Sequence, residues 1–169
     1  MKTANRALAL ILSVLILIST MSVFASAAVM GFYDFPVGSW SEEAMTAAVN
    51  NNLLKGRGNG IIAPKDYITR AEAAAVINRA FGATVKADIS KYTDVSKKDW
   101  YYDEIAKAVN MQTIVGVSSN QVDPTGYITR ESMLVVIARA LVLSDDDYSS
   151  LKRFNDKNKI SSWAKEYIS

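Results

Sequence analysis

A period of 60 residues is the feature that most constrains this fold. Shifting the 169-residue sequence against itself by 60 positions aligns two long segments without a gap. The matches run along the whole unit and include Asp34 with Asp94, Trp40 with Trp100, Gly56 with Gly116, Pro64 with Pro124, and Tyr-Ile-Thr-Arg at 67–70 with the same residues at 127–130. A fixed period of this length indicates one supersecondary unit that is copied along the chain and stacked on its neighbour.

A third copy of the unit begins near the end of the sequence. Phe154-Asn155-Asp156 and then Trp163 repeat the start of each unit, with one more residue between aspartate and tryptophan. We therefore expect two complete units and a truncated third. The predicted divisions are a first unit at 28–82, a linker at 83–91, a second unit at 92–143, a linker at 144–153 and the partial unit at 154–169.

Each unit is predicted to begin with a short helix. Ser39 opens the first one, and Glu42 stands three residues later, which is the pattern of a capping box. Asp99 opens its counterpart in the second copy. Gly56 and Gly116 follow these helices, where a residue in the left-handed conformation is expected at a helix end.

A second helix with a clearer start is predicted in each unit. Thr69 caps it and Glu72 completes a capping box, and apolar residues then recur at helical spacing. In the second copy Glu131-Ser132 replaces Ala71-Glu72, so no capping box is expected there. The predicted fold class is therefore mainly α, built from tandem helix-loop-helix repeats.

The N-terminus has the pattern of a secretory signal peptide. Lys2 and Arg6 precede an apolar run at 7–18, and Ala25-Ser26-Ala27 supplies a small-residue cleavage site. The prediction is a signal peptide at 1–27, with an uncleaved N-terminal anchor as the alternative.

Removal of the signal peptide takes away two of the 19 basic residues and none of the 17 acidic ones, which leaves the charges of the mature chain balanced. We expect a secreted protein without a membrane anchor after cleavage, and no nucleic-acid partner, since such binding usually needs a clustered basic surface.

The composition removes most kinds of catalytic chemistry. There is no cysteine and no histidine, which excludes thiolate nucleophiles, disulfides, Ser-His-Asp triads and imidazole metal sites.

The run Asp145-Asp146-Asp147 lacks the spaced ligands and glycine of a calcium loop and is interpreted as a solvated linker. No cofactor and no metal are expected. A carboxylate-dependent glycoside hydrolase remains as an alternative, but no acidic pair stands out by motif, and we predict that the chain is not an enzyme.

The ordered motifs resemble the S-layer homology (SLH) family. They are Phe32-x-Asp34, Trp40, Gly56, Pro64 and Ile68-Thr69-Arg70-Ala71-Glu72, and most of them recur in the second copy. The resemblance implies mostly helical repeats, usually three about a pseudo-threefold axis, which bind secondary cell-wall polymers, often pyruvylated, in grooves between repeats. Because the third copy lacks its second helix, the pseudo-threefold arrangement is expected to be incomplete.

Two arginines are the leading candidates for a ligand site. Arg70 and Arg130 follow a capping threonine, so each is expected at the first turn of a helix, where free N–H groups and the helix dipole favour an anion. A guanidinium binds a carboxylate, such as a pyruvate ketal, through two parallel hydrogen bonds. An ion pair within the repeat is the alternative, and the resemblance favours the ligand.

For the other candidates the structural alternative is the favoured one. Trp40 and Trp100 stack on sugar faces or pack within the core between repeats. Asp34 and Asp94 accept hydrogen bonds from a saccharide or cap a turn. Gly56 and Gly116 admit a ligand to the backbone or end a helix. Arg79 and Arg139 are interpreted as residues of exposed helix faces.

These observations predict a non-catalytic module that binds a bacterial secondary cell-wall glycopolymer at the cell surface. The expected partner is therefore a cell-wall polysaccharide. A self-associating structural envelope protein, joined through the incomplete third repeat, is the alternative from a different class.

Overall fold

The computed structural model describes residues 28–169, so the predicted signal peptide at 1–27 lies outside the described part. The fold is mainly helical, as predicted. The α-helices are α2 (Glu42–Asn50), α3 (Arg70–Ala80), α4 (Tyr102–Asn110), α5 (Arg130–Ala140) and α6 (Lys165–Ile168), and three 3-10 segments are η1 (Tyr148–Arg153), η2 (Lys157–Lys159) and η3 (Ser162–Ala164). Extended pairing in residues 28–169 is limited to isolated bridges. Within the same range, no helix combines the length and apolar character that a bilayer span requires.

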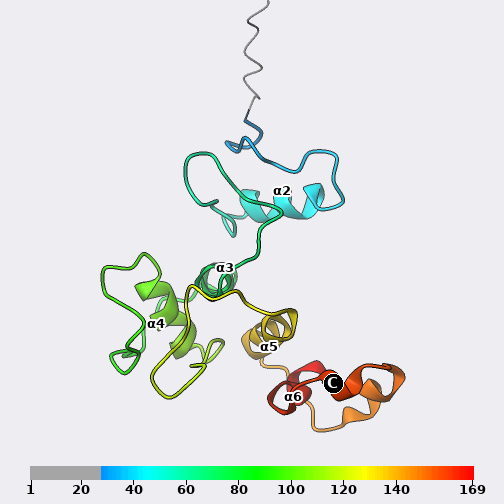
Figure 1. The fold of residues 1–169 in the computed structure, drawn as a ribbon. Helices are drawn as coiled ribbons and strands as arrows, with labels where there is room; N and C mark the ends of the chain where they lie inside the picture. The colour runs from blue at the N-terminus through cyan, green and yellow to red at the C-terminus, as the bar shows by residue number, and fades with distance from the viewer. Residues whose placement is uncertain (1–27) are drawn as a thin grey trace, which may run out of the picture.

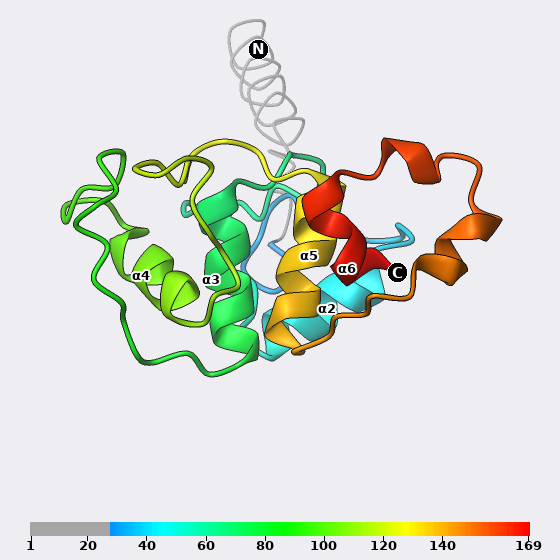
Figure 2. The same ribbon diagram turned by 90° about the horizontal axis from the view of Figure 1, so that it is seen from below.

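The helices pack across the repeat boundary. The first helix of the second copy, α4, lies on the second helix of the first copy, α3, and α6 with η3 lies in the same way on α5. Figure 2 shows α3 and α5 side by side at the centre, with α4 outside α3 and α6 outside α5. The packing unit is therefore a second helix together with the first helix of the next copy.

Small side chains allow α3 and α4 to approach closely. Ala71, Ala74 and Ile77 of α3 and Ile105 of α4 are almost fully buried in one cluster. Asn78, which is 2% exposed, adds a polar link, because its Nδ2 donates to the backbone oxygen of Glu104 at 2.8 Å and to its carboxylate at 2.8 Å. A buried side-chain amide with these bonds fixes the register of the two helices as well as their contact.

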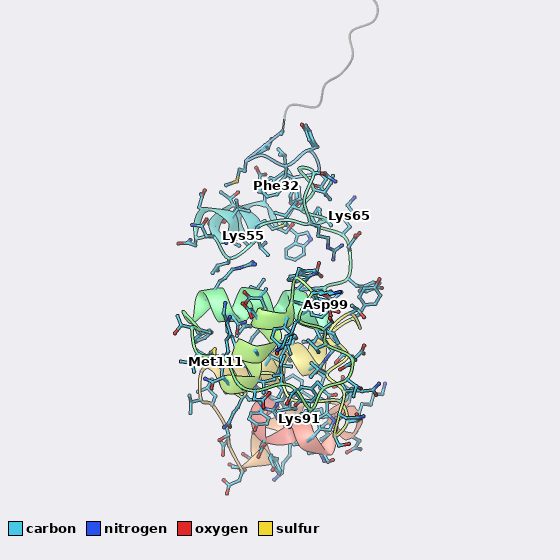
Figure 3. The ribbon with its side chains drawn as sticks, turned by 90° about the vertical axis from the view of Figure 1, so that its left-hand side faces the viewer. Phe32, Lys55, Lys65, Lys91, Asp99 and Met111 are labelled. Atoms are coloured by element: carbon cyan, nitrogen blue, oxygen red, sulfur yellow. The ribbon has the colours of Figure 1, made fainter. Side chains whose placement is uncertain are left out.

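The linker predicted at 83–91 contributes to this core. Ile89 is 1% exposed, and the N–H of Ala87 donates to the oxygen of Ala106 in α4 at 3.0 Å. The connection is therefore packed along α4 and adds to the α3–α4 unit. Figure 3 shows Lys91, at its end, on the side of α3 opposite to Phe32 and Lys65, which lie with α2.

The first helix, α2, differs from its counterpart α4 because none of its residues is buried. Figure 1 shows α2 apart from α4 and α6, on another side of the central pair α3 and α5. The start predicted at Ser39 is wrong, since α2 begins at Glu42 and its N-cap residue, Ser41, makes no side-chain capping bond. The carboxylate of Glu42 instead accepts from the N–H of Gly38 at 2.6 Å.

The sequence indicated that Gly56 and Gly116 end the first helices, but they do not. After α2 and α4 the left-handed residues are Asn52, with φ of 58°, and Gln112, with φ of 58°. Gly56 and Gly116 come four residues later in each copy, within the loop. Residues other than glycine do adopt this conformation, so the spacing of glycines alone gave the wrong position.

The second helices begin where the sequence predicted. Thr69 accepts from the N–H of Glu72 at 3.2 Å, and the carboxylate of Glu72 accepts from the N–H of Thr69 at 2.8 Å, which completes the capping box. Thr129 caps α5 by accepting from the N–H of Ser132 at 3.1 Å. Ser132 is too short to return the second bond, which agrees with the expected loss of the box.

Candidate ligand-binding site

An aspartate clamps the loop of each repeat. The N–H groups of Ile62 and Ala63 donate to the carboxylate of Asp34, both at 2.8 Å. Asp94 repeats this arrangement in the second copy by accepting from Val122 and Asp123. The bond from Ile62 is the main cause that lowers the pKa of Asp34 below its usual range. Both aspartates therefore shape the loops, and neither lines the two cavities that these loops border.

The two predicted glycines are required by close backbone contact. A Cβ at Gly116 would lie 2.5 Å from the oxygen of Ser118 and 2.8 Å from that of Gln121. A Cβ at Gly56 would lie 2.5 Å from the oxygen of Ile61, and its φ is +71°. A side chain at either position would displace loop backbone, and in both copies this loop forms one wall of a pocket.

Arg70 connects the two repeats. Its Nε donates to the oxygen of Val122 at 2.8 Å, and one Nη donates to the oxygen of Val115 at 2.9 Å. Burial is the main influence that lowers the pKa of Arg70, and Asp123 and Asp94 oppose it by their charge. An arginine stays protonated under these conditions. Within residues 28–169 Arg70 makes no ion pair, so the alternative of an internal salt bridge is not observed.

The start of α3 is occupied by the neighbouring repeat. The N–H of Arg70 donates to the oxygen of Gly126 at 2.9 Å, and that of Ala71 donates to the oxygen of Pro124 at 2.9 Å. The expectation of free N–H groups at this helix start is therefore wrong. The carbonyls of the second loop take the place that an anion would need.

Arg130 has a different environment from Arg70. It is exposed, and within the described part of the chain its side chain makes no hydrogen bond and lines neither pocket. Beside it, Glu131 accepts from the N–H of Ser161 at 2.7 Å and from its hydroxyl at 2.9 Å, which ties α5 to the third copy. The repeat thus places two identical motif arginines in unlike surroundings.

Two cavities lie at equivalent places in the two repeats. One measures about 650 Å³ and the other about 460 Å³. The first, which we name the Arg79 pocket, is lined by Gly56, Ala75, Val76, Arg79 and Trp100 among others. The second, the Arg139 pocket, is lined by their repeat counterparts Gly116, Val135, Val136, Arg139 and Trp163. Both volumes fall in the range of small-ligand sites.

The tryptophan of the next copy forms an edge of each pocket. Trp100 is 63% exposed at the Arg79 pocket and Trp163 is 49% exposed at the Arg139 pocket, whereas Trp40 is 96% exposed and lines neither. The interpretation of these tryptophans as core residues is therefore wrong. The apolar faces of Trp100 and Trp163 are open to a ligand.

The Arg139 pocket is positively charged. Arg70 and Arg139 line it, and none of its lining residues is acidic. The guanidinium of Arg139 lies over the ring of Tyr167, 4.8 Å from its centroid. Stacking of this kind holds the planar group in place and leaves its N–H edge available.

The Arg79 pocket contains an ion-pair network. Arg57 donates from Nε to Glu72 at 2.6 Å, from Nη1 to Asp66 at 2.7 Å and from Nη2 to the oxygen of Tyr67 at 2.9 Å. Burial raises the pKa of Glu72, but the bonds from Arg57 and Thr69 outweigh it, so this pKa lies below its usual value. Glu72 is therefore ionised at neutral pH.

Sequence reasoning missed the pocket arginines. Arg79 and Arg139 were interpreted as residues of exposed faces, yet both are partly buried and line the cavities. The Nη1 of Arg79 also donates to the oxygen of Leu53 at 2.9 Å. The signal was present in the repeat itself, because Arg79-Ala80 and Arg139-Ala140 match at the same offset as the other motifs.

The run Asp145-Asp146-Asp147 is exposed, and the carboxylate of Asp147 accepts from the N–H of Ser149 at 2.9 Å. Across residues 28–169 no group of three or more potential protein ligands is placed to hold a metal ion. The two pockets remain the candidate places for a ligand among the described residues.

Comparison with known proteins agrees with the repeat and the fold. A surface-layer 125 kDa protein of Lysinibacillus sphaericus is 30% identical over 144 residues, which are 85% of this chain and 12% of that protein. The S-layer protein sap of Bacillus anthracis is 27% identical over 136 residues, 80% of this chain and 16% of that protein. An endoglucanase of Bacillus sp. (strain KSM-635) is 26% identical over 140 residues, 81% of this chain and 15% of that protein. The chain thus spans a small part of the length of each relative.

The sequence-family model of the S-layer homology domain matches this chain at two places, residues 32–74 and 91–134. These ranges contain the clamping aspartates, the loop glycines and the Thr-Arg starts of α3 and α5. The two matches follow the same repeat that the helices and pockets follow. This chain belongs to the S-layer homology domain family.

Proposed function

We propose that this chain binds an anionic secondary cell-wall glycopolymer without a covalent bond and so associates with the cell surface. Family membership and the surface-layer relatives support association with the cell wall in general. The observation that carries the finer proposal is the Arg139 pocket, where two guanidinium groups, Arg70 and Arg139, lie beside Trp163 with no acidic lining residue.

The chemistry of that pocket suits a sugar with a carboxylate substituent. The edge of Arg139 offers parallel N–H donors to a carboxylate, such as a pyruvate ketal, and Trp163 offers an apolar plane to the sugar ring. Arg70 uses Nε and one Nη for backbone oxygens, and its other Nη has no hydrogen-bond partner among residues 28–169. Each of these groups contributes to recognition of a negative charge next to a pyranose face.

The polymer partner is tested by sedimentation of the purified mature protein with isolated cell-wall sacculi. We expect the protein to pellet with sacculi and to remain in the supernatant after the glycopolymer has been removed chemically. Arg139→Gln should weaken pelleting by at least about tenfold, which corresponds to roughly 1.4 kcal/mol. Pelleting that does not depend on the glycopolymer would contradict the proposal.

Arg130→Gln is the matched control, because Arg130 lies on the same helix and carries the same charge but lines neither pocket. We expect it to pellet as the unaltered protein does. A loss equal to that of Arg139→Gln would restore the role that the sequence predicted for Arg130 and would remove the support for the pocket.

The described carboxylates favour binding over hydrolysis. Asp66 and Glu72 are the acidic pair in a pocket, and both are bound to Arg57. A glycoside hydrolase needs one protonated carboxyl group as general acid, whereas the lowered pKa of Glu72 keeps it ionised. Incubation with wall polysaccharide should release no reducing ends, and release of product would contradict this assignment.

Self-association is a second candidate, supported by the exposure of α2. The other first helices lie on a second helix, but α2 has no buried residue, and Trp40 just before it is 96% exposed. A second copy that covers this face would bury apolar surface. Light scattering over a range of concentrations measures the molar mass in solution, and a constant monomer mass would exclude this candidate.

A further inference from the structure

The two pockets differ in charge at three positions that change together. Arg57, Asp66 and Glu72 of the first copy correspond to Val117, Gly126 and Ser132 of the second. In the first copy Arg57 forms an ion pair with Asp66 and another with Glu72. The second copy therefore lacks the whole network, and the equivalent cavities present different chemistry.

The network makes the Arg79 pocket a poorer site for an anion than the Arg139 pocket. Every nitrogen of the Arg57 guanidinium donates to a protein oxygen, at distances between 2.6 and 3.0 Å. A carboxylate that enters this pocket meets an arginine with four of its five N–H donors already used. It also meets the negative charges of Asp66 and Glu72, which offset two of the three positive charges of Lys55, Arg57 and Arg79 in the lining. Like charges at short distance in a partly enclosed site repel each other.

The same pocket is well suited to hydroxyl groups. Asp66 is 61% exposed, and its Oδ1 has no hydrogen-bond partner among residues 28–169. A carboxylate oxygen accepts strongly from a hydroxyl donor. Trp100 adds an exposed aromatic plane at the edge of the cavity. Hydroxyl acceptors beside an aromatic ring are the features that hold a neutral sugar.

We propose that the two pockets divide the glycopolymer between them, so that the Arg139 pocket binds an acidic sugar and the Arg79 pocket binds a neutral one. The proposal rests on polymer binding as the function. It adds that Arg57, Asp66 and Glu72 determine the specificity of the first pocket, although the two pockets lie in equivalent copies of one repeat.

Each pocket carries its own fluorescent reporter. The double variant Trp40→Phe, Trp163→Phe leaves Trp100 at the Arg79 pocket, and Trp40→Phe, Trp100→Phe leaves Trp163 at the Arg139 pocket. Both are titrated with glycopolymer released from Gram-positive sacculi, and with the same polymer after carbodiimide activation and borohydride reduction of its carboxyl groups to alcohols. Circular dichroism confirms that each variant is folded.

Reduction of the polymer's carboxyl groups should weaken binding at only one of the two reporter tryptophans. We expect Trp163 to lose affinity for the polymer by at least about tenfold, while Trp100 changes by less than about twofold. Equal losses at both reporters would overturn the division. So would a fluorescence response at neither reporter while the protein still pellets with sacculi.

Removal of the acidic groups from the Arg79 pocket should change its preference. With Asp66→Asn and Glu72→Gln added to the Trp100 reporter, Lys55, Arg57 and Arg79 remain without a carboxylate in the lining. The native polymer should then bind at Trp100 at least about tenfold more tightly than the reduced polymer. Asp103→Asn is the control, because Asp103 is exposed, pairs with Lys86 and lines neither pocket.

The result separates this inference from the proposed function. If pelleting depends on the glycopolymer but the altered pocket shows no preference for carboxyl groups, the division between the pockets is wrong and polymer binding stands. If pelleting does not depend on the glycopolymer, the proposed function fails and the division fails with it.

Discussion

Arg70 of the first repeat donates from its side-chain Nε to the backbone oxygen of Val122 in the second repeat, at 2.8 Å. Val122 is fully buried, and its own N–H donates to Asp94. One side chain thus joins the start of α3 to the loop that Asp94 holds in place. Arg70 stabilises the contact between repeats at the same place where it lines the Arg139 pocket.

Replacement of Arg70 should therefore destabilise the fold. Arg70→Ala removes two hydrogen bonds from a charged group to backbone oxygens, and we expect the free energy of unfolding to fall by about 2–4 kcal/mol. Arg130→Ala, at the equivalent but exposed position, should change it by less than about 0.5 kcal/mol. Urea denaturation followed by circular dichroism measures both. Equal effects would show that the bonds to the second loop do not contribute to stability.

The clamp at Asp34 should make stability depend on pH. The N–H of Ile62 and that of Ala63 hold the folded pKa below the unfolded value, so the stabilisation is complete above the unfolded pKa of about 3.9. It is lost as the pH falls through the folded pKa. The loss of thermal stability between pH 6 and pH 3 should be smaller for Asp34→Asn than for the unaltered protein. An identical loss in both proteins would contradict the clamp.

The loop at Gly116 should not accept a side chain. A Cβ there meets the backbone oxygens of Ser118 and Gln121, which belong to the loop itself and do not move as a flexible side chain does. We expect Gly116→Ala to lower the free energy of unfolding by about 1–3 kcal/mol, as overpacking does. Gly82→Ala measures a different cost, that of placing a side chain at a φ of +65°, since no heavy atom lies within 4 Å of its added Cβ. If Gly116→Ala left the free energy of unfolding unchanged, the contact argument would fail.

The two threonine caps should be of similar strength. Thr69→Ala and Thr129→Ala each remove a hydroxyl that accepts from a backbone N–H, and in Thr69→Ala the backbone N–H of residue 69 can still donate to Glu72. We expect each variant to lower the free energy of unfolding by about 1 kcal/mol. Thermal unfolding of the two variants measures both costs. An unchanged stability in both variants would show that the hydroxyl caps do not stabilise α3 and α5.

Local signals predicted the parts of this fold that depend on local interactions. The Thr69 and Thr129 starts of α3 and α5 were found correctly because a cap joins residues three positions apart. The N-cap of α2 was misplaced by two residues, at Ser39 instead of Ser41, because Ser39, which has the right spacing to Glu42, makes no bond to it through its side chain. Spacing alone does not distinguish a capping box from a turn before the helix.

The candidate site was predicted in part, and the reason lies in the distance along the chain. Arg70, Trp100, Gly56 and Gly116 do line pockets, whereas Asp34 and Asp94 hold loops 28 residues away. Arg79 and Arg139 were missed because helical periodicity gives the face of a residue but not the element that covers this face.

The sequence by itself determined the repeat, the family, the helical class and the motif residues, because each of these is written in short patterns that recur at one offset. Only the tertiary structure decided that α4 packs on α3 and α6 on α5, and hence which side chains share a cavity. Two identical Thr-Arg motifs end in unlike surroundings because Arg70 meets the loop of the next copy and Arg130 does not. Contacts between copies depend on residues that are far apart in sequence, and no local pattern encodes them.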